Sequence, residues 1–498
     1  MAEKNYQRLV VVSNRLPVVL QRQDGAWHLK EGSGGLVSAL GPVLRDRGGI
    51  WIGWPGTSEV MGLREVRRIL GPASENSGYR LFPVFLSTED VESFYQGFSN
   101  GIVWPLFHDL QGRCDFLPAH WHAYLRVNEH FATAVAKHTN PHNLLWIHDY
   151  HLIHVAEMLA RRDTARRCVF FLHIPFPPLD IFAKLPWRVS ILRALTAYDL
   201  VAFQTARDRR NFFACLRAFF PQATVQGRGP VMTATVDERS FSVAAIPISI
   251  DYGDFARTAR SASVRRQATL LREQYRVEKV ALGVDRLDYT KGIPERLLAF
   301  QSALSRHPEL RGRLSLVQLV VPSREEVKAY RELKDRIELL VSGINGKYTK
   351  DGWVPVIYLY QSMDRATLIA HYLAADIALV TPLKDGMNLV CKEYCAAHTD
   401  QRGVLILSEF AGAAAQLSDA VLINPYDTEG TADAIWQAFT MSEKDQRRRM
   451  VNLRRRIQRQ DVFWWVDNFL QAAAGVELDD FPEVELAPVL PLRRHESP

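Results

Sequence analysis

The stretch IALVTPLKDGMNLVCKEY, residues 377–394, contains one full unit of the pattern that decides the fold. An apolar run over 377–383 breaks into a charged turn that contains Gly386, and a helix then begins. Glu393 in that helix lies eight residues after Asp385 in the turn. A run that is apolar at every position indicates a strand buried on both faces, as in a parallel sheet covered by helices. Three interpretations of the two carboxylates are open: a catalytic pair, a metal site, or parts of a binding pocket.

Similar apolar runs recur along the chain, and each ends in a polar or glycine-containing turn. In the first half they cover 8–14, 50–54, 144–150, 168–174 and 200–205, and in the second half 243–248, 280–286, 314–321, 356–360, 377–383 and 403–410. Segments with helical periodicity lie between them, for example 151–161, 186–196 and 365–375. Strands that alternate with helices predict an α/β fold, and 498 residues suffice for two doubly wound Rossmann-like domains.

The domain boundaries are predicted from the same pattern. The first domain is expected to cover 1–248 and the second 249–456. A helix within 457–478 carries a large apolar surface, so we expect it to pack back on the first domain. Residues 479–498 are rich in proline and glutamate and are expected to form a flexible tail.

The composition narrows the class of partner. The 61 basic and 55 acidic residues give a net charge of +6, which suits anionic small molecules. The sequence has no block of lysine and arginine that would indicate binding of nucleic acid. The apolar run near the N-terminus is too short for a signal peptide, and no run reaches the ~18–20 apolar residues of a membrane span. The five cysteines lack the spacing of a zinc site, which is typical of reduced thiols in a cytoplasmic protein.

Polar side chains follow many of the predicted strands. Ligands of doubly wound sheets bind at the carboxyl ends of the strands, so these side chains are candidate site residues. They are Arg15, Asp149, His173, Arg286, Lys291, Arg324, Asp385 and Glu393. Two cations such as Arg286 and Lys291 suit a diphosphate. Salt bridges to the neighbouring Asp285 and Asp288 are the alternative.

The histidines and glycines of the first half have competing interpretations. His148 and His151 suggest a metal site, but residues three apart at a strand end point to opposite faces. We therefore prefer a role for Asp149 in binding sugar hydroxyls. His173 either caps a strand or belongs to the site. The glycines within 32–35 either let backbone N–H groups approach an anion or form an ordinary turn.

Several long motifs carry a resemblance to a known family. They are VVVSNRLP, GGL, FSNGIVWPLFH, WIHDYHL, FFLHIPFP, GVDRLDYTKGIPER, INGKY, TPLKDGMNLVCKEY and LSEFAGAA. In order and spacing, from about residue 8 to 475, the chain resembles the trehalose-6-phosphate synthases. These are retaining glycosyltransferases of the GT-B type, with two Rossmann-like domains that face a central cleft. The family also includes glucosylglycerol-phosphate synthases.

The resemblance implies a role for each candidate residue. The donor, UDP-glucose or ADP-glucose, is expected in the second domain and the phosphorylated acceptor in the first. The implied donor-binding residues are Gly35, Arg286, Lys291, Asp385, Gly386, Met387, Asn388, Leu389 and Glu393. The implied acceptor-binding residues are Arg15, Tyr95, Trp104, Asp149 and Arg324. The implied catalytic residues are His173, Asp149, Arg286 and Lys291.

The chemistry that the resemblance implies is attack on the donor sugar from the face that the diphosphate leaves. Cationic side chains would stabilise the leaving diphosphate in place of a divalent metal, so neither a metal nor another cofactor is expected. Under this hypothesis Asp385 and Glu393 grip different parts of one ligand. They would not flank a bond as the two acids of a glycosidase do.

Two acceptors are compatible with the resemblance. Glucose 6-phosphate, giving α,α-trehalose 6-phosphate, is the leading hypothesis, and glycerol 3-phosphate with ADP-glucose is the alternative. Asp109, Trp187 and Ser249 depart from the most familiar family pattern, partly near the acceptor half. A non-catalytic nucleotide-sugar-binding subunit is a third hypothesis. It predicts that charged residues at the strand ends have been replaced. The sequence predicts small-molecule substrates. It leaves open the base of the donor nucleotide and the oligomeric state, and a homo-oligomer is among the states left open.

Overall fold

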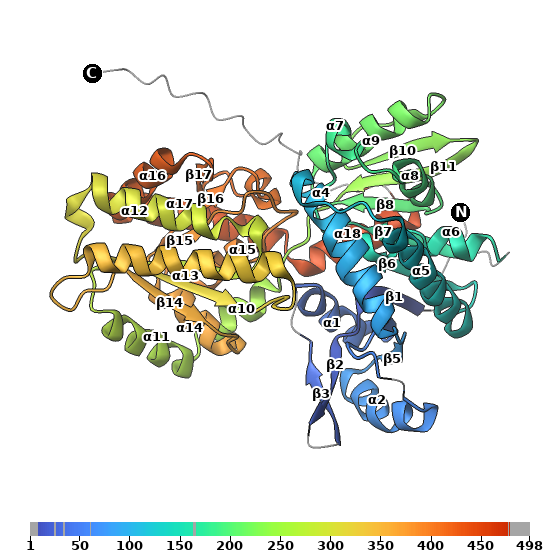
Figure 1. The fold of residues 1–498 in the computed structure, drawn as a ribbon, viewed down its shortest axis with the longest axis horizontal. Helices are drawn as coiled ribbons and strands as arrows, with labels where there is room; N and C mark the ends of the chain where they lie inside the picture. The colour runs from blue at the N-terminus through green and yellow to red at the C-terminus, as the bar shows by residue number, and fades with distance from the viewer. Residues whose placement is uncertain are drawn as a thin grey trace. The chain divides into compact units, whose positions relative to one another are not determined.

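The computed structural model describes residues 8–23, 26–32, 35–59, 61–162, 166–476 and 478. The chain divides into two compact units, the first extending to Asp251 and resuming at Gln460, and the second covering Tyr252–Arg459. Each unit contains a sheet with parallel strands and helices packed against it (Figure 1). The predicted α/β fold is confirmed. The flexible tail predicted for 479–498 lies outside the described residues.

The main sheet of the first unit has the strand order β5-β4-β1-β6-β7-β8-β11-β10-β9. Its strands are β1 Arg8–Arg15, β4 Ile50–Trp54, β5 Arg80–Pro83, β6 Asn143–His148, β7 Arg167–Phe171, β8 Leu200–Phe203, β9 Thr224–Gln226, β10 Val231–Val236 and β11 Arg239–Ala245. The pairs from β5 to β11 are parallel, whereas β9, β10 and β11 pair antiparallel. The strand order reverses between β1 and β6, and such a switch point is where ligands of this fold class bind.

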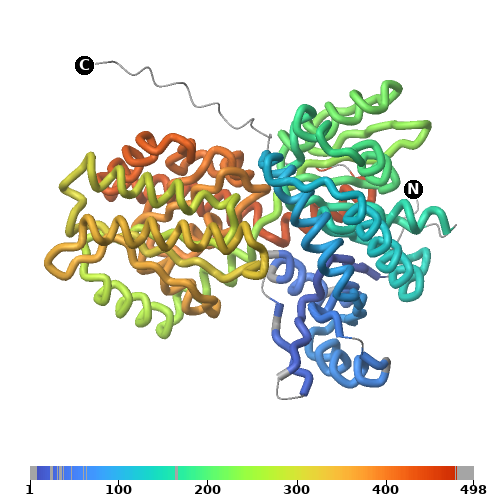
Figure 2. Tube along the Cα trace, in the orientation of Figure 1, coloured from blue at the N-terminus to red at the C-terminus, as the bar shows by residue number. Residues whose placement is uncertain are grey.

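Helices and a separate hairpin complete the first unit. The hairpin pairs β2 Val18–Gln23 with β3 Ala26–Glu31. The helical elements are α1 Gly35–Arg47, α2 Leu63–Ser77, α3 Thr88–Asp90, the π-helix η1 Val91–Val103, α4 Trp104–Phe107, η2 Gln111–Arg113, α5 Pro118–His138, η3 Tyr150–Leu152, α6 Val155–Ala160, α7 Leu179–Phe182, α8 Arg188–Thr196, α9 Ala206–Phe219 and α18 Val462–Ala474. Figure 2 follows the chain through these elements from blue to green, with α18 in red.

Helix α18 returns to the first unit near the end of the chain. Asp461 caps its first turn by accepting hydrogen bonds from the backbone N–H groups of Phe463 and Trp464 at 3.0 Å. Phe469 stacks on Trp146 of β6 with ring centroids 4.1 Å apart. The helix is therefore held by aromatic packing on β6, one of the two strands that flank the switch point.

The second unit has a fully parallel sheet in the order β14-β13-β12-β15-β16-β17. The strands are β12 Lys279–Arg286, β13 Leu314–Val321, β14 Val356–Tyr360, β15 Ile377–Val380, β16 Val404–Ser408 and β17 Val421–Ile423. The helical elements are α10 Tyr252–Ala259, α11 Ala262–Tyr275, η4 Tyr289–Lys291, α12 Ile293–Arg306, η5 Pro308–Leu310, α13 Lys328–Tyr348, α14 Arg365–Ala374, α15 Val390–Ala397, η6 Gly412–Ala415, α16 Thr428–Thr440 and α17 Glu443–Arg459. Its switch point lies between β12 and β15.

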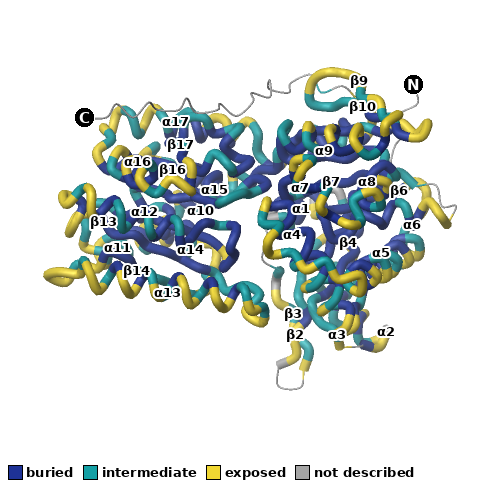
Figure 3. Tube along the Cα trace, turned by 45° about the horizontal axis from the view of Figure 1, so that its top comes forward, coloured by how far each residue is buried: buried dark blue, intermediate teal, exposed yellow. Residues whose placement is uncertain are grey.

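The strands form the buried core of each unit, while the outward faces of the helices are exposed (Figure 3). Every apolar run named above overlaps a strand, but several strands end earlier than the runs do. The run 144–150 stops as strand at His148, because Asp149 adopts a positive φ of 72° that breaks the ladder. The strands that were not predicted are the parallel β5 and β17, the antiparallel β9 and β10, and the hairpin β2–β3. Among the described residues, no helix is both long and apolar enough to span a bilayer.

Candidate functional site

The candidate donor residues of the second unit follow β12 and β15, which are neighbours in the sheet. Arg286 is the exposed last residue of β12, and Lys291 ends the short helix η4 that follows. Asp385 lies in the turn between β15 and α15. Because the carboxyl ends of parallel strands share one edge of the sheet, these three side chains come from one side of the unit.

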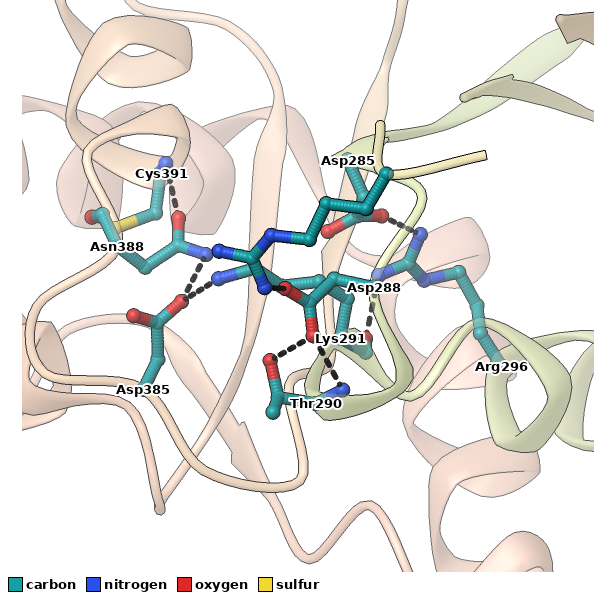
Figure 4. A network of polar contacts seen from close by, with 9 residues as sticks. Asp285, Asp288, Thr290, Lys291, Arg296, Asp385, Asn388 and Cys391 are labelled. Carbon is teal, nitrogen blue, oxygen red and sulfur yellow. Dashed lines mark hydrogen bonds and ion pairs between the residues drawn. The ribbon is translucent and has the colours of Figure 1, made fainter. Parts of the chain in front are cut away.

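An ion pair between Lys291 and Asp385 forms the centre of this group (Figure 4). Lys291 Nζ lies 2.6 Å from Asp385 Oδ2, and the same oxygen accepts a hydrogen bond from Asn388 Nδ2 at 3.2 Å. The two charged side chains are 12% and 15% exposed. The pair is shielded enough to be strong and open enough for a ligand to reach it.

The turn after Asp385 is built by close backbone packing. A Cβ on Gly412 would lie 1.9 Å from the carbonyl oxygen of Gly386, so only glycine fits there. Asn388 adopts a positive φ of 75°, and its side-chain Oδ1 accepts from the backbone N–H of Cys391 at 3.2 Å in the first turn of α15. The sequence DGMN therefore brings its own backbone and the start of a helix next to the Lys291–Asp385 pair.

Asp288 is a buried carboxylate surrounded by cations. Arg324 Nη1 lies 3.9 Å from its Oδ2, and the pKa of the carboxyl reflects that environment. Burial would raise this pKa, but the charges of Arg324, Arg286 and Lys291 outweigh burial and hold it below the ordinary value. Because Lys291 is also paired with Asp385, three cations face two carboxylates, and the remaining positive charge favours a diphosphate or phosphate.

The alternative role for the cations, local salt bridges to Asp285 and Asp288, agrees only partly with the structure. Asp285 pairs with Arg296 of α12 at 2.5 Å, with side chains 2% and 1% exposed (Figure 4). Sequence reasoning did not identify Arg296, although a buried aspartate in a strand requires a partner. The structure places Arg324 beside Asp288 and within hydrogen-bond distance of the Tyr330 hydroxyl, 2.5 Å away. Its expected role towards the acceptor phosphate stays a prediction.

Glu393 lies one turn into α15. The hydroxyl of Tyr372, from α14, donates to Glu393 Oε2 at 2.7 Å. Burial raises the pKa of the Glu393 carboxyl, although this hydrogen bond opposes the effect. A partly desolvated carboxylate with one oxygen already bonded is suited to hold hydroxyl groups.

In the first unit, Arg15 is framed by aromatic rings at the end of β1. Its guanidinium carbon lies 4.1 Å from the ring centroid of Trp54 and 5.6 Å from that of Tyr95. These cation–π contacts hold the guanidinium in place. Trp54 was not among the predicted site residues; its position at the end of the strand IWIGW is the signal that would have suggested it.

Tyr95 lies in the π-helix η1, and Trp104 directly follows that helix as the first residue of α4. They are nine residues apart, which would place them on opposite sides of an α-helix with about 3.6 residues per turn. The i→i+5 bonds of a π-helix lengthen each turn, and both rings contact one aromatic pair. Tyr95 stacks on His151 at 5.9 Å and Trp104 lies 5.9 Å from Tyr150, while those two partners are 3.9 Å apart.

Asp149 and His173 meet beyond the ends of β6 and β7. Asp149 Oδ1 accepts a hydrogen bond from the backbone N–H of His173 at 3.2 Å. The ring nitrogen Nε2 of His173 is 3.1 Å from Nδ1 of the buried His148. Burial lowers the pKa of His173 to about 3, so its ring is neutral at pH 7.

The two histidines considered as metal ligands do not point to opposite faces of a strand, as the sequence suggested. His148 is the last residue of β6, whereas His151 lies in the short helix η3. His148 contacts His173, and His151 packs between Tyr95 and Tyr150. Within the described residues, no three His, Cys, Asp or Glu side chains are grouped as metal ligands.

The remaining predicted positions are placed as follows. Gly35 is the first residue of α1, and the glycines before it, 33 and 34, lie outside the described residues. Of the departures from the family pattern, Trp187 stacks on Trp121 with centroids 5.3 Å apart, and Ser249 is fully buried. Both are therefore packing residues of the first unit.

Comparisons with known proteins extend these observations. The model of glycosyltransferase family 20 matches residues 7–475. A trehalose-6-phosphate synthase of Mycobacterium bovis is 43% identical over 472 residues, which cover 94% of each chain. A bifunctional trehalose-6-phosphate synthase/phosphatase of Thermoproteus tenax is 42% identical over 93% of this chain and 63% of its own length.

Solved structures agree with the family match. An α,α-trehalose-phosphate synthase (UDP-forming) from Burkholderia xenovorans in complex with glucose-6-phosphate has a TM-score of 0.84 at 30% identity, covering 94% of this chain and 99% of its own. The E. coli protein described as trehalose-6-phosphate bound with UDP-2-fluoro glucose has a TM-score of 0.84 at 34% identity, with the same coverage. The predicted GT-B type of fold is confirmed by these similarities.

Proposed function

Since this chain belongs to glycosyltransferase family 20, we propose that it transfers glucose from a nucleotide-diphosphate glucose to glucose 6-phosphate. The products would be α,α-trehalose 6-phosphate and the nucleoside diphosphate, with the anomeric configuration of the donor retained. The observation that carries the proposal is the cationic group around Asp288 together with the Lys291–Asp385 pair. The names of the similar proteins supply the acceptor.

The donor would bind to the second unit. Its diphosphate would lie against Arg286 and Lys291, two of the cations that hold the pKa of Asp288 below its ordinary value. Asp385 and the backbone of 386–389 would hold the glucose hydroxyls, and Glu393 the ribose hydroxyls. The Lys291 ammonium group would then interact less with Asp385 and more with the phosphate oxygens, because an anion of higher charge competes for it.

The acceptor phosphate would bind to Arg15 in the first unit. Trp54 and Tyr95 fix the guanidinium by cation–π contact, so little side-chain freedom is lost when the phosphate arrives. Trp104 shares the same aromatic group and would line the acceptor site. Asp149, held at a positive φ of 72°, would accept hydrogen bonds from acceptor hydroxyls. Arg324 would add a second cation for the acceptor phosphate.

The chemical step would form one bond to the anomeric carbon while another breaks. The anomeric hydroxyl oxygen of glucose 6-phosphate attacks C1 of the donor glucose from the face that the diphosphate leaves. The bond from C1 to the diphosphate oxygen breaks with its electron pair on that oxygen, which takes the proton of the attacking hydroxyl. Arg286 and Lys291 stabilise the developing charge. The neutral His173 can hydrogen-bond the donor sugar without adding a charge next to the cationic C1.

A matrix of donors and acceptors tests the proposal. The purified protein is incubated with UDP-glucose or ADP-glucose, each with glucose 6-phosphate or glycerol 3-phosphate, and the products are identified by mass spectrometry and NMR. We expect α,α-trehalose 6-phosphate with two α-anomeric signals. Product with glycerol 3-phosphate alone would overturn the acceptor assignment, a β linkage would overturn retention, and binding without any product would indicate a non-catalytic subunit.

A further inference from the structure

Tyr372 contacts a carboxylate of the candidate donor site from below the surface. It lies in α14, its side chain is fully buried, and its hydroxyl donates to Glu393 Oε2 at 2.7 Å. The contact joins two helices that are separated along the chain by β15 and the turn at Asp385. No sequence motif singled out this tyrosine, and the proposed donor contacts do not include it.

The position of Tyr372 is fixed on several sides. Its backbone carbonyl lies 2.9 Å from His398 Nε2, and its ring meets that of Tyr394 edge to face, with centroids 6.4 Å apart at 88°. Tyr394 is fully buried as well. Close packing on this scale leaves the phenol one orientation, so its hydroxyl marks a fixed point for the carboxylate to meet.

The hydrogen bond assigns different tasks to the two oxygens of Glu393. Burial raises the pKa of the Tyr372 phenol well above its ordinary value, so the group keeps its proton and donates it to Oε2. Among the described residues, no side chain or backbone group is hydrogen-bonded to the other oxygen, Oε1, and Glu393 is partly exposed. One oxygen is therefore held while the other can accept from a ligand.

We infer that Tyr372 is a positioning residue for donor binding, which holds Oε2 of Glu393 so that Oε1 faces the ribose hydroxyls of the nucleotide. The inference rests on the proposed function, in which Glu393 binds the ribose. The physical gain is preorganisation, because a free glutamate side chain loses much rotamer freedom when it is ordered. Tyr372 orders it before the ligand arrives.

The test compares nucleotides with and without ribose hydroxyls. Wild type and Tyr372→Phe are titrated calorimetrically with UDP and ADP and with their 2′,3′-dideoxy analogues. Loss of one hydrogen bond to a charged group should weaken binding of the ribonucleotide about tenfold, while binding of the dideoxy analogue is unchanged. Equal weakening of both ligands, or of neither, would overturn the inference, because a merely structural role does not depend on the ribose hydroxyls.

Two further variants serve as controls. Tyr394→Phe removes another buried hydroxyl, which bonds weakly to the backbone carbonyl of Ala375 at 3.4 Å, and should leave the preference for ribonucleotides unchanged. Tyr372→Phe introduced into Glu393→Ala, which removes the acceptor of its hydrogen bond, should cause no additional ribose-dependent loss if the tyrosine acts through the carboxylate. An additional loss would contradict that route.

Two outcomes separate this inference from the proposed function. If Glu393→Gln leaves ribonucleotide binding intact, the proposed role of Glu393 fails and the inference fails with it, whether or not the transferase assay gives product. If Tyr372→Phe does not fold, Glu393→Asp replaces it, because the shorter side chain withdraws the carboxylate from an intact Tyr372. It must then show the same ribose-dependent loss, and its absence would overturn the inference.

Discussion

Two ion pairs involve residues of the same short segment, 285–296, but their side chains differ in exposure. Asp285 and Arg296 lie 2.5 Å apart with side chains 2% and 1% exposed, whereas Lys291 and Asp385 lie 2.6 Å apart with 12% and 15% exposed. Nearly equal distances therefore accompany different surroundings. The two charges of a fully buried pair stay paired with each other, whereas a pair at the edge of a site can exchange one partner for a ligand.

The fully buried pair supports the partly buried pair, Lys291–Asp385, through its additional contacts. Arg296 from α12 also donates to Thr381 Oγ1 after β15 and to Gln318 Oε1 of β13, both at 3.0 Å. With Asp285 of β12, one guanidinium thus joins three neighbouring strands directly below the candidate diphosphate site. Ion pairs should therefore be interpreted from exposure and neighbours, because distance alone does not separate structural from functional roles.

The largest expected effect on folding comes from breaking the buried pair. Arg296→Met leaves Asp285 as an uncompensated buried charge, so the free energy of unfolding should fall by about 3–5 kcal/mol, measured by urea denaturation. Asp285→Asn added to this variant should recover part of the loss, because it removes the stranded charge. A loss below about 1 kcal/mol, the range of exposed pairs, would erase the distinction between the two pairs.

Breaking the partly buried pair, Lys291–Asp385, should affect activity more than stability. Lys291→Met should lower kcat/KM for the donor by about 100- to 1000-fold, because the leaving diphosphate loses a cation. The free energy of unfolding should change by only about 1 kcal/mol, since Asp385 keeps Asn388 and access to water. Nucleoside diphosphate binding by calorimetry is the direct check, and unchanged affinity would contradict the diphosphate role.

Lys392 is another buried cation, and it predicts how stability depends on pH. Burial lowers the pKa of Lys392 from 10.5 to about 7, and its ammonium donates to Gln416 Oε1 at 2.7 Å. Between pH 7 and 10.5 the unfolded chain binds the proton that the folded chain has released, so stability rises with pH in this window. The rise from pH 7 to 9 should be about 2 kcal/mol and should be absent in Lys392→Met. Equal pH profiles in chemical denaturation would contradict the depressed pKa.

The smallest expected effect is that of metal removal. If Arg286 and Lys291 supply the charge that a divalent metal supplies elsewhere, incubation with excess EDTA should leave the transfer rate unchanged. Dialysis against EDTA followed by the donor–acceptor assay measures it, with added MgCl2 as the comparison. Complete loss of activity that returns with a metal would assign the charge stabilisation to the metal.

Much of the fold could be predicted because burial leaves a local pattern. Strands covered on both faces are apolar at every position, so each predicted run overlaps a strand. The antiparallel strand β10 lies at the side of the sheet and is partly exposed, and its sequence VMTATV lacks that pattern. Strand ends were less predictable, because a single backbone conformation such as that of Asp149 ends the ladder.

The candidate site was predictable to the extent that it lies at strand ends. Lys291 and Asp385 were identified because each follows an apolar run, and the structure joins them directly. Arg296, Trp54 and Tyr372 were missed. Arg296 and Tyr372 lie inside helices, where the sequence periodicity indicates burial but does not identify a partner.

The order of most strands and helices, the family resemblance and the residue types at the strand ends can be read from the sequence. Which charges pair depends on the tertiary structure, and so does the contact of Tyr95 and Trp104 with one aromatic pair. The physical reason is the range of the interactions. Burial patterns and turn chemistry depend on neighbours along the chain, whereas a salt bridge or ring contact depends on positions that only the packed sheet and helices bring within a few ångströms.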